Sequence, residues 1–137
     1  MSSAYPEVDR VLFPVATRVA ATVIGDVTTS ALKAALDGLA QRQRVTADNI
    51  ANINTPGFLA GRVDFESSLR GAIAGGDDPA SANAVVARSL EPTNTNGNNV
   101  NLDSETIIAT ETGLRYQLAL NALDGKYNQL RTALRTQ

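Results

Sequence analysis

Two stretches of the chain carry apolar residues at alternating spacings of four and three, the period of a helix that packs along a partner helix. The first stretch covers residues 28–53, and the hydroxyl side chains of Thr28, Thr29 and Ser30 can each cap its start. Its stripe consists of Leu32, Leu36, Leu39, Gln43, Thr46, Ile50 and Ile53. The two polar members, Gln43 and Thr46, weaken the middle of the stripe and favour partner-facing positions that fix register at some cost in stability.

The second stretch covers residues 101–137 and has a cleaner stripe. Its members are Tyr116, Leu120, Leu123, Tyr127, Leu130 and Leu134, and the same spacing extends back through Gly113, Ala109, Thr106 and Leu102. Either Asn101 or Asp103 can act as the N-cap. Acidic residues lie early in this stretch and basic residues late, which is the order that complements a helix dipole. At ~1.5 Å per residue, a helix from about Leu102 to Arg135 would be on the order of 50 Å long.

Residues 54–100 are rich in Gly, Asn, Pro, Asp and Ser, and the runs GGDDPASAN and EPTNTNGNN break regular structure. Short strands are predicted near residues 63–65 and 85–90, and we expect much of this segment to be poorly ordered in an isolated molecule. Residues 1–27 form an N-terminal extension, in which residues 11–24 can form one short helix interrupted by Pro14. That stretch is too short to span a bilayer, and it lacks the basic leading segment of a secretory signal.

These patterns predict a mainly α fold. Its four segments are an extension over 1–27, a coiled-coil helix over 28–53, an irregular, loop-rich middle over 54–100 that can hold short β segments, and a coiled-coil helix over 101–137. Two long helices at the ends of a chain pack most simply as an antiparallel coiled-coil hairpin. Alanines flank both stripes, at Ala31, Ala35, Ala47, Ala51, Ala119 and Ala122. They reflect either helix propensity alone or packing against neighbouring copies, and head-to-tail contacts that do not close generate a helical filament.

The composition of the chain excludes several kinds of functional site. The chain has 12 basic and 14 acidic residues, mixed at similar density, so no basic stripe points to a nucleic acid. It contains neither cysteine nor histidine, which excludes disulfides, thiolate chemistry, imidazole bases and the common zinc sites. We therefore expect no catalytic residue, no metal site, no cofactor and no small-molecule substrate.

Two alternatives were weighed against this expectation. An EF-hand at residues 91–105 would place Gly97 sixth in the loop, which puts Pro92 first and Asp103 last, so the calcium register fails. A hydrolase would need paired carboxylates in a pocket that shifts a pKa. The nearest pairs, at residues 64 and 66 and at residues 77 and 78, lie in loop-like surroundings and favour solvated turns.

The first helical stripe ends in the sequence Asn-Thr-Pro-Gly-Phe. Pro56 lacks an amide donor and disfavours helical geometry at Thr55, and Pro56-Gly57 suits the central positions of a type II turn. Asn52 and Asn54 are predicted to build this turn. Asn49, one helical turn earlier, can cap a loop or bond a neighbouring helix. Phe58 is expected to fold back as an apolar anchor.

The sequence ALDGLAQRQRVTADNIANINTPGF closely resembles the N-terminal signature of bacterial flagellar rod and hook proteins, an amphipathic helix that ends in A-N-N-I-A-N-x-N-T-P-G-[YF]. Residues 31–58 match almost throughout. The departures are Asp48 for an asparagine, Phe58 for the commoner tyrosine and Leu59 for a basic residue. The chain length, NGNNVNLDSE at 96–105 and LRYQLALNALDGKYNQLRTAL at 114–134 resemble the short proximal-rod branch of this family, because longer members insert β domains between the same helices.

The resemblance implies a structural subunit that is exported by the flagellar type III apparatus and added to the periplasmic rod of the basal body. Such a subunit polymerises helically with copies of itself and other rod proteins, links the membrane ring and its adaptor to the axial structure, and transmits torque. The motif residues are then Asn49, Asn52, Asn54, Thr55, Pro56, Gly57 and Phe58, with the two stripes as assembly surfaces. Two alternatives stay open at this point: the sister proximal-rod protein of similar length, and a generic coiled-coil scaffold.

Overall fold

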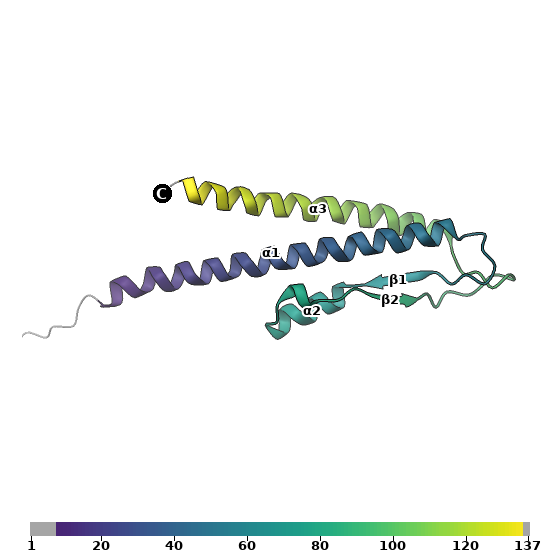
Figure 1. Ribbon diagram of the computed structural model, residues 1–137, viewed down its shortest axis with the longest axis horizontal. Coiled ribbons are helices and arrows are strands. Elements are labelled where there is room, and N and C mark those ends of the chain that lie inside the picture. Colours follow the sequence, from purple (N-terminus) through teal and green to yellow (C-terminus); the bar gives the residue numbers. More distant parts are fainter. Residues whose placement is uncertain (1–7, 136–137) are drawn as a thin grey trace, which may run out of the picture.

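The computed structural model describes the backbone of residues 8–135 and, within it, the side chains of residues 26–135 (Figure 1). The elements follow in the order α1 (Val8–Ala51), β1 (Gly61–Asp64), α2 (Glu66–Gly75), a 3-10 turn η1 (Pro79–Ser81), β2 (Val85–Arg88) and α3 (Leu102–Arg135). The mainly α prediction with long helices in both terminal regions and short β segments between them is therefore confirmed. Among the described residues, no helix combines the length and apolarity needed to cross a bilayer.

The predicted boundary at residue 28 is wrong, because α1 is one continuous helix of 44 residues. It includes residues 11–24, which were expected to form a separate short helix, and it passes through Pro14. A proline removes one helical hydrogen bond, and the helix continues on both sides of it. The part of the predicted extension over residues 1–7 lies outside the described residues.

The other helix ends follow local chemistry. α1 ends at Ala51 and not at Ile53, because the Asn52 N–H is shared between the carbonyls of Asp48 and Asn49, both at 3.1 Å, where the chain turns. At the start of α3, the Asn101 Oδ1 accepts from two backbone N–H groups of the first turn, at 3.0 and 3.2 Å. Asn101 is therefore the cap, the first of the two predicted candidates.

The middle segment has more regular structure than the sequence pattern predicts. β1 and β2 pair antiparallel, with Gly61 opposite Arg88 and Asp64 opposite Val85. The unpredicted helix α2 follows β1 directly. The Asp64 carboxylate accepts from the N–H and hydroxyl of Ser67 at its start, and Gly76 closes its end at φ 76° with the left-handed conformation that favours glycine.

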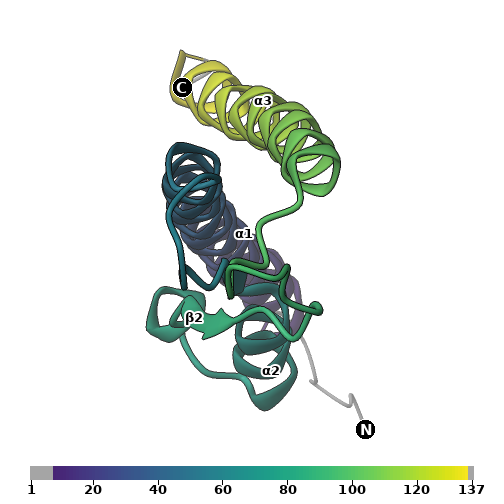
Figure 2. The ribbon, with the colours of Figure 1, turned by 90° about the vertical axis from the view of Figure 1, so that its right-hand side faces the viewer.

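α1 is the central layer of the molecule. Figure 1 shows the chain running along α1 in one direction and returning along α3 in the other, with the sheet and α2 on the opposite side of α1. Figure 2 shows the same three layers from the end. The apolar cluster at the centre is formed by Leu39, Val63 and Phe65, against which Ala35, Val45, Leu69, Ala84, Tyr116 and Ala119 pack. The middle segment thus completes a core that two helices alone would leave thin.

Only some residues of each predicted stripe are buried or half-buried in the structure. On α1, Leu39 and Thr46 are buried, Leu32, Leu36 and Ile50 are half-buried, and Gln43 is exposed. Ile53, just beyond the helix, is half-buried. On α3, Tyr116, Leu120 and Leu123 are half-buried, whereas Tyr127, Leu130 and Leu134 are exposed. At the start of α3 the buried positions are Glu105 and Thr112 instead of Leu102 and Thr106, because this end of the helix meets polar groups of α1 and β1.

Candidate assembly junction

The Thr-Pro-Gly-Phe sequence after α1 forms a tight reverse turn. The Phe58 N–H donates to the Thr55 carbonyl at 3.2 Å, and Gly57 has φ 72°, the left-handed conformation required at the third position of a type II turn. The Asn52 side chain braces the turn by donating to the Asp48 carbonyl at 2.8 Å and accepting from the Thr55 hydroxyl at 3.1 Å. The turn is therefore held on both sides of Pro56.

A second asparagine-rich loop clamps this turn from outside. The Gly57 N–H donates to the Asn96 carbonyl at 2.9 Å. The Asn98 side chain is almost fully buried, and its amide donates to the carbonyls of Asn52 and Thr55 at 2.9 and 2.8 Å. The segment before α3 thus adds a second hydrogen bond to each of two carbonyls of the turn, which also accept from the N–H groups of Thr55 and Phe58.

Asn49 joins α1 to both β1 and α3. Its side chain is 1% exposed, accepts from the Gly61 N–H at 2.9 Å and donates to the Gly61 carbonyl, also at 2.9 Å. The same amide donates to Glu105 of α3 at 3.0 Å. A side-chain amide offers a donor and an acceptor together, so it can replace a missing strand neighbour.

Glu105 is the fully buried charge of this region. Its carboxylate pairs with the Arg62 guanidinium of β1, and Arg62 also meets Glu91 at 3.1 Å. Burial works to lower the pKa of Arg62, but the hydrogen bond and charge of Glu105, assisted by Glu91, outweigh it and raise that pKa. Among the described residues, every buried side-chain nitrogen and oxygen has a partner, so the network is satisfied.

Arg42 fixes the middle segment to the same face of α1. Its guanidinium donates to the Val63 carbonyl at 2.8 and 3.2 Å, pairs with Glu66 and lies 4.9 Å from the centre of the Phe65 ring. Burial works to raise the pKa of Glu66, but the hydrogen bond and charge of Arg42 outweigh it, and the pKa lies below its ordinary value. The Phe65 ring packs on Gly38, where a Cβ would lie 2.3 Å from the ring.

We call this set of contacts the junction: residues 49–61 and 96–105, with Arg62 of β1. It brings together Asn49, Asn52, Thr55, Pro56 and Gly57 of the predicted motif. Asn54 is exposed, and Phe58 is only half-buried. The buried aromatic anchor is Phe65 instead, because it meets the gap left by Gly38.

Sequence reasoning missed Asn98, Asn99, Glu105 and Arg62. The available signal was a second cluster of asparagines, NGNNVN, directly before a helix. The pattern indicates turn formers. It does not show that these asparagines also bond residues 52, 55 and 60, which lie 39 to 46 residues away in the sequence, or that Glu105 bonds Asn49 and Arg62, which lie 56 and 43 residues away.

Three of the four acidic residues considered for hydrolysis have structural partners for their side chains. Asp64 accepts from Ser67, Glu66 pairs with Arg42, and Asp78 accepts from the Ala80 N–H and the Ser30 hydroxyl. In the part of the chain that the structure describes, no group of three or more acidic side chains could hold a metal.

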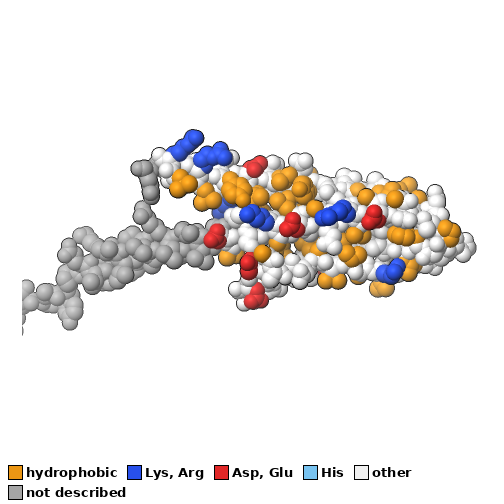
Figure 3. All heavy atoms as spheres, in the orientation of Figure 1, with side chains coloured by type: hydrophobic (Ala, Val, Ile, Leu, Met, Phe, Trp, Pro, Cys, Tyr) orange, Lys and Arg blue, Asp and Glu red, His pale blue; other side chains and the backbone are white. Residues whose placement is uncertain are grey.

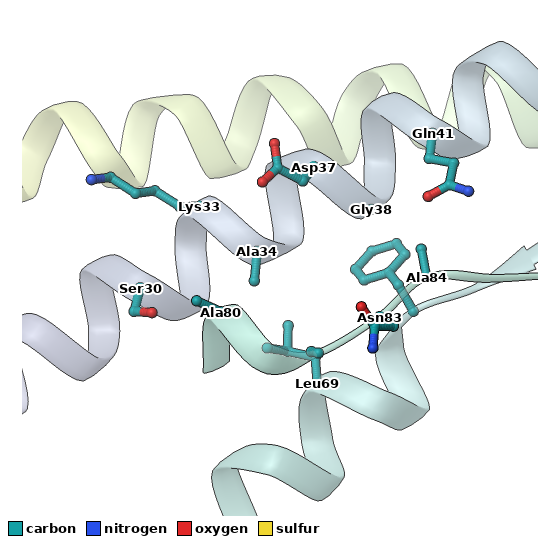
Figure 4. A pocket seen from close by; sticks show the side chains of 12 residues that line it. Ser30, Lys33, Ala34, Asp37, Gly38, Gln41, Leu69, Ala80, Asn83 and Ala84 are labelled. Atoms are coloured by element: carbon teal, nitrogen blue, oxygen red, sulfur yellow. The ribbon is translucent and has the colours of Figure 1, made fainter. Parts of the chain in front are cut away.

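An open cavity of about 460 Å³ lies between α1 and the segment that leads into β2 (Figure 4). Ala34 and Gly38 of α1 line it opposite Leu69 and Ala80. Lys33 and Asp37 of α1 also line the cavity, which marks where the middle segment lies against α1.

Comparison with known proteins identifies the family. The family model described as flagella basal body rod protein matches residues 26–58, a range that ends at the turn after α1. The flagellar basal body rod protein FlgB of Escherichia coli (strain K12) is 33% identical over 122 residues, which cover 74% of this chain and 88% of that protein. The chain belongs to the FlgB family of flagellar basal body rod proteins.

FlgB proteins of other bacteria show a similar level of identity to this chain. The protein of Bacillus subtilis (strain 168) is 34% identical over 105 residues, covering 68% of this chain and 81% of that protein. That of Borreliella burgdorferi is 32% identical over 108 residues, covering 63% and 79%. This FlgB-family chain is a structural subunit of the proximal rod of the flagellar basal body, and the FlgB assignment replaces the sister rod protein and the generic scaffold.

Proposed function

We propose that this chain polymerises helically with copies of itself and with other rod proteins, and that α1 and α3 act in the rod as an antiparallel coiled coil. The rod so formed links the membrane ring and its adaptor to the axial structure and transmits torque. The subunit reaches the periplasm through the flagellar type III export apparatus. Membership of the FlgB family supports the location, and the surface of α3 supports the mode of assembly.

The observation that carries the proposal is the apolar surface of α3. Its predicted stripe continues into residues that the subunit leaves uncovered, with Leu130 55% and Leu134 79% exposed. Nearer the start of the helix, Ile107, Leu114 and Leu118 are each more than 60% exposed. Figure 3 shows hydrophobic side chains exposed along α3. Apolar surface spread along a long helix is typical of a surface that meets other subunits.

The junction has a separate part in this proposal. It fixes the point where the chain leaves α1 and the point where it enters α3, through Asn49, Asn98 and Glu105. In the rod, this polar network would couple both helices to the sheet, so that the subunit transmits torque as one unit. The assembly surfaces are formed by two stripes. The first consists of Leu32, Leu36, Leu39 and Ile50 on α1 with Ile53 just beyond its end, and the second of Tyr116, Leu120, Leu123, Tyr127, Leu130 and Leu134 on α3.

The test is mass spectrometry of purified hook-basal-body particles from the native organism. We expect peptides of this chain at a few copies per particle, in constant ratio to the other rod proteins. Absence from intact particles would overturn the proposal that the chain polymerises into the rod. A strain that lacks the chain should lose motility, and plasmid-borne protein should restore it.

A further inference from the structure

The asparagine-rich loop before α3 contains Asn96-Gly97, which is the only Asn-Gly pair in the sequence. An asparagine in front of glycine is prone to deamidation, because glycine has no Cβ to shield its backbone nitrogen from the side-chain amide. Asn96 is exposed, so water reaches its side chain, whereas Gly97 is half-buried. The pair therefore combines a reactive sequence with a position inside the junction.

Deamidation here needs only water and hydroxide as co-reactants. Hydroxide removes the proton of the Gly97 nitrogen, and the nitrogen attacks Cγ of Asn96, so that negative charge develops on Oδ1. The Cγ–Nδ2 bond then breaks, and Nδ2 takes a proton from water and leaves as ammonia. Water opens the cyclic imide that remains. Cleavage of its Cγ–N bond gives aspartate, whereas cleavage of its other C–N bond gives isoaspartate, whose main chain contains one additional carbon.

The folded loop holds the reacting atoms. The Gly97 N–H donates to the Asn94 carbonyl at 2.9 Å, a bond that must break before the nitrogen can lose its proton. The Asn96 carbonyl accepts from the Gly57 N–H at 2.9 Å, which restricts rotation of the peptide group that contains this nitrogen. The Asn96 Oδ1 accepts from the Asn98 N–H at 3.1 Å, where a donor also stabilises developing negative charge. Two bonds therefore oppose the reaction, and one favours it.

We propose that Asn96 is a deamidation site controlled by the junction: a closed junction protects it, and an open junction exposes it to modification. The buried Asn98 side chain provides this control, because its amide donates to the carbonyls of Asn52 and Thr55 at 2.9 and 2.8 Å. These bonds and the bond from Gly57 join the same two segments. Opening of the clamp therefore also releases the peptide group between residues 96 and 97.

The isoaspartyl product prevents the junction from closing again. Its additional main-chain carbon displaces Gly97 from Gly57, and the space between them is small, since a Cβ on Gly97 would lie 3.4 Å from the Gly57 Cα. Asn98 then loses its position beside the turn. The modification accumulates in subunits whose junction stays open. Because this chemistry does not depend on rod assembly, its failure would leave the proposed function intact.

The first test compares deamidation of the full-length chain in buffer and in urea. Mass spectrometry follows the tryptic peptide 89–115, whose other asparagines are internal controls. A synthetic peptide of the same residues corrects for the effect of urea on the chemistry. We expect Asn96 to react at least about tenfold more slowly in the folded chain than in the unfolded chain. Equal rates, or faster reaction at another asparagine of the unfolded chain, would overturn the proposal.

A matched pair of variants tests the clamp. Asn98→Ala removes the side-chain bonds across the junction, whereas Asn94→Ala changes an exposed side chain of the same loop and keeps the carbonyl that binds Gly97. We expect Asn96 to react at least about fivefold faster in Asn98→Ala than in the parent, and Asn94→Ala to match the parent. Equal rates for the parent and a folded Asn98→Ala chain would exclude control by the clamp. If circular dichroism shows Asn98→Ala to be unfolded, the comparison of the parent in buffer and urea decides.

The product is tested on deamidated subunits, which anion exchange separates by their added charge. Asn96→Asp is the control, because it carries the same charge without the additional main-chain carbon. We expect the Gly57 amide to lose its protection from hydrogen exchange in the isoaspartyl fraction and to keep it in Asn96→Asp. Protection in both would show that the junction closes over the product and would overturn that part of the proposal.

Discussion

At the scale of single residues, asparagine side chains form hydrogen bonds with backbone N–H and carbonyl groups that another backbone segment would otherwise form. Asn49 occupies the outer edge of β1, and Asn99 lies between two strands, accepting from the Ala60 N–H at 2.7 Å and donating to the Ser89 carbonyl at 3.3 Å. Asn98 satisfies two carbonyls at the end of α1. Each amide supplies a donor and an acceptor within one short side chain, which no charged residue does.

The buried carboxylate of Glu105 gives the first prediction. Glu105→Ala leaves Arg62 and the Asn49 amide without their shared acceptor, so we expect a loss of about 2 kcal/mol in the free energy of unfolding. The value lies below that for a fully buried pair, because the Arg62 side chain is 28% exposed. Urea unfolding followed by far-UV circular dichroism measures it.

The matched control is Glu111→Ala, at an exposed position later on α3. Glu111 is exposed and pairs with Arg115 within one helix, so its removal should change the free energy by less than about 1 kcal/mol. Equal losses for the two variants would contradict a special role for the buried network.

Gly38 gives the second prediction at this scale. A Cβ at this position would lie 2.3 Å from the Phe65 ring, so Gly38→Ala should force the ring out of its place and destabilise the subunit, although alanine favours a helix. Gly125→Ala is the control, since a Cβ there meets nothing within 4 Å and should stabilise α3 by about 0.5–1 kcal/mol. Thermal unfolding of both variants would show shifts of opposite sign; a raised melting temperature for Gly38→Ala would refute the close packing.

At the scale of elements, α1 packs against α3 on one side and against the sheet and α2 on the other. The Arg42 side chain connects α1 to β1 and to the first residue of α2, while Glu66 also lies 3.4 Å from Arg115 of α3. The middle segment therefore docks through charge as well as through Leu39 and Phe65. This double attachment explains why residues 61–88 form regular structure despite their loop-rich composition.

The pH dependence of this attachment can be predicted from Glu66. Its pKa in the folded state lies below the unfolded value, so its contribution to stability is present above the unfolded pKa and is lost as pH falls through the folded pKa. Glu66→Gln should therefore be less stable than the parent at pH 7, and the difference should shrink below about pH 4. Unfolding free energies across pH 2–7, with exposed Asp124→Asn as control, measure this; a difference that stays constant down to pH 2 would exclude the ion pair as its cause.

At the scale of the whole molecule, the subunit buries one side of α3 and leaves the other side and its C-terminal half uncovered. Tyr127, Leu130 and Leu134 continue the stripe beyond the part that α1 covers. Burial of this surface against neighbouring subunits would be favourable at roughly 25 cal/mol per Å² of apolar area. In the proposed rod, the same stripe would therefore contact α1 at one end and neighbouring subunits at the other.

Leu130→Asp separates folding from assembly. Since Leu130 is exposed in the subunit, we expect the variant to unfold at the parent temperature within about 2 °C, while its incorporation into hook-basal-body particles falls at least about tenfold. Gln129→Glu, an added charge on the neighbouring exposed position, should leave both properties unchanged. Normal motility and normal particle content in the Leu130→Asp strain would remove this part of α3 from the assembly surface.

The sequence alone predicted the features that depend on neighbours along the chain. The apolar spacing of four and three marked both long helices, Pro56-Gly57 marked the turn, and Asn101 was one of two predicted caps. These signals are local, because helix periodicity, the fixed φ of proline and the capping of a first turn involve residues within about four positions.

Tertiary structure decided the rest. The continuity of α1 through residue 28, the formation of α2, the burial of Glu105 and Thr112 in place of Leu102 and Thr106, and the choice of Phe65 over Phe58 all depend on contacts between elements. Asn98 and Glu105 have partners more than 40 residues away, and a polar residue shows in the sequence only that it needs a partner. The periodicity of the chain determined the two long helices, whereas the satisfaction of buried polar groups determined how the elements meet.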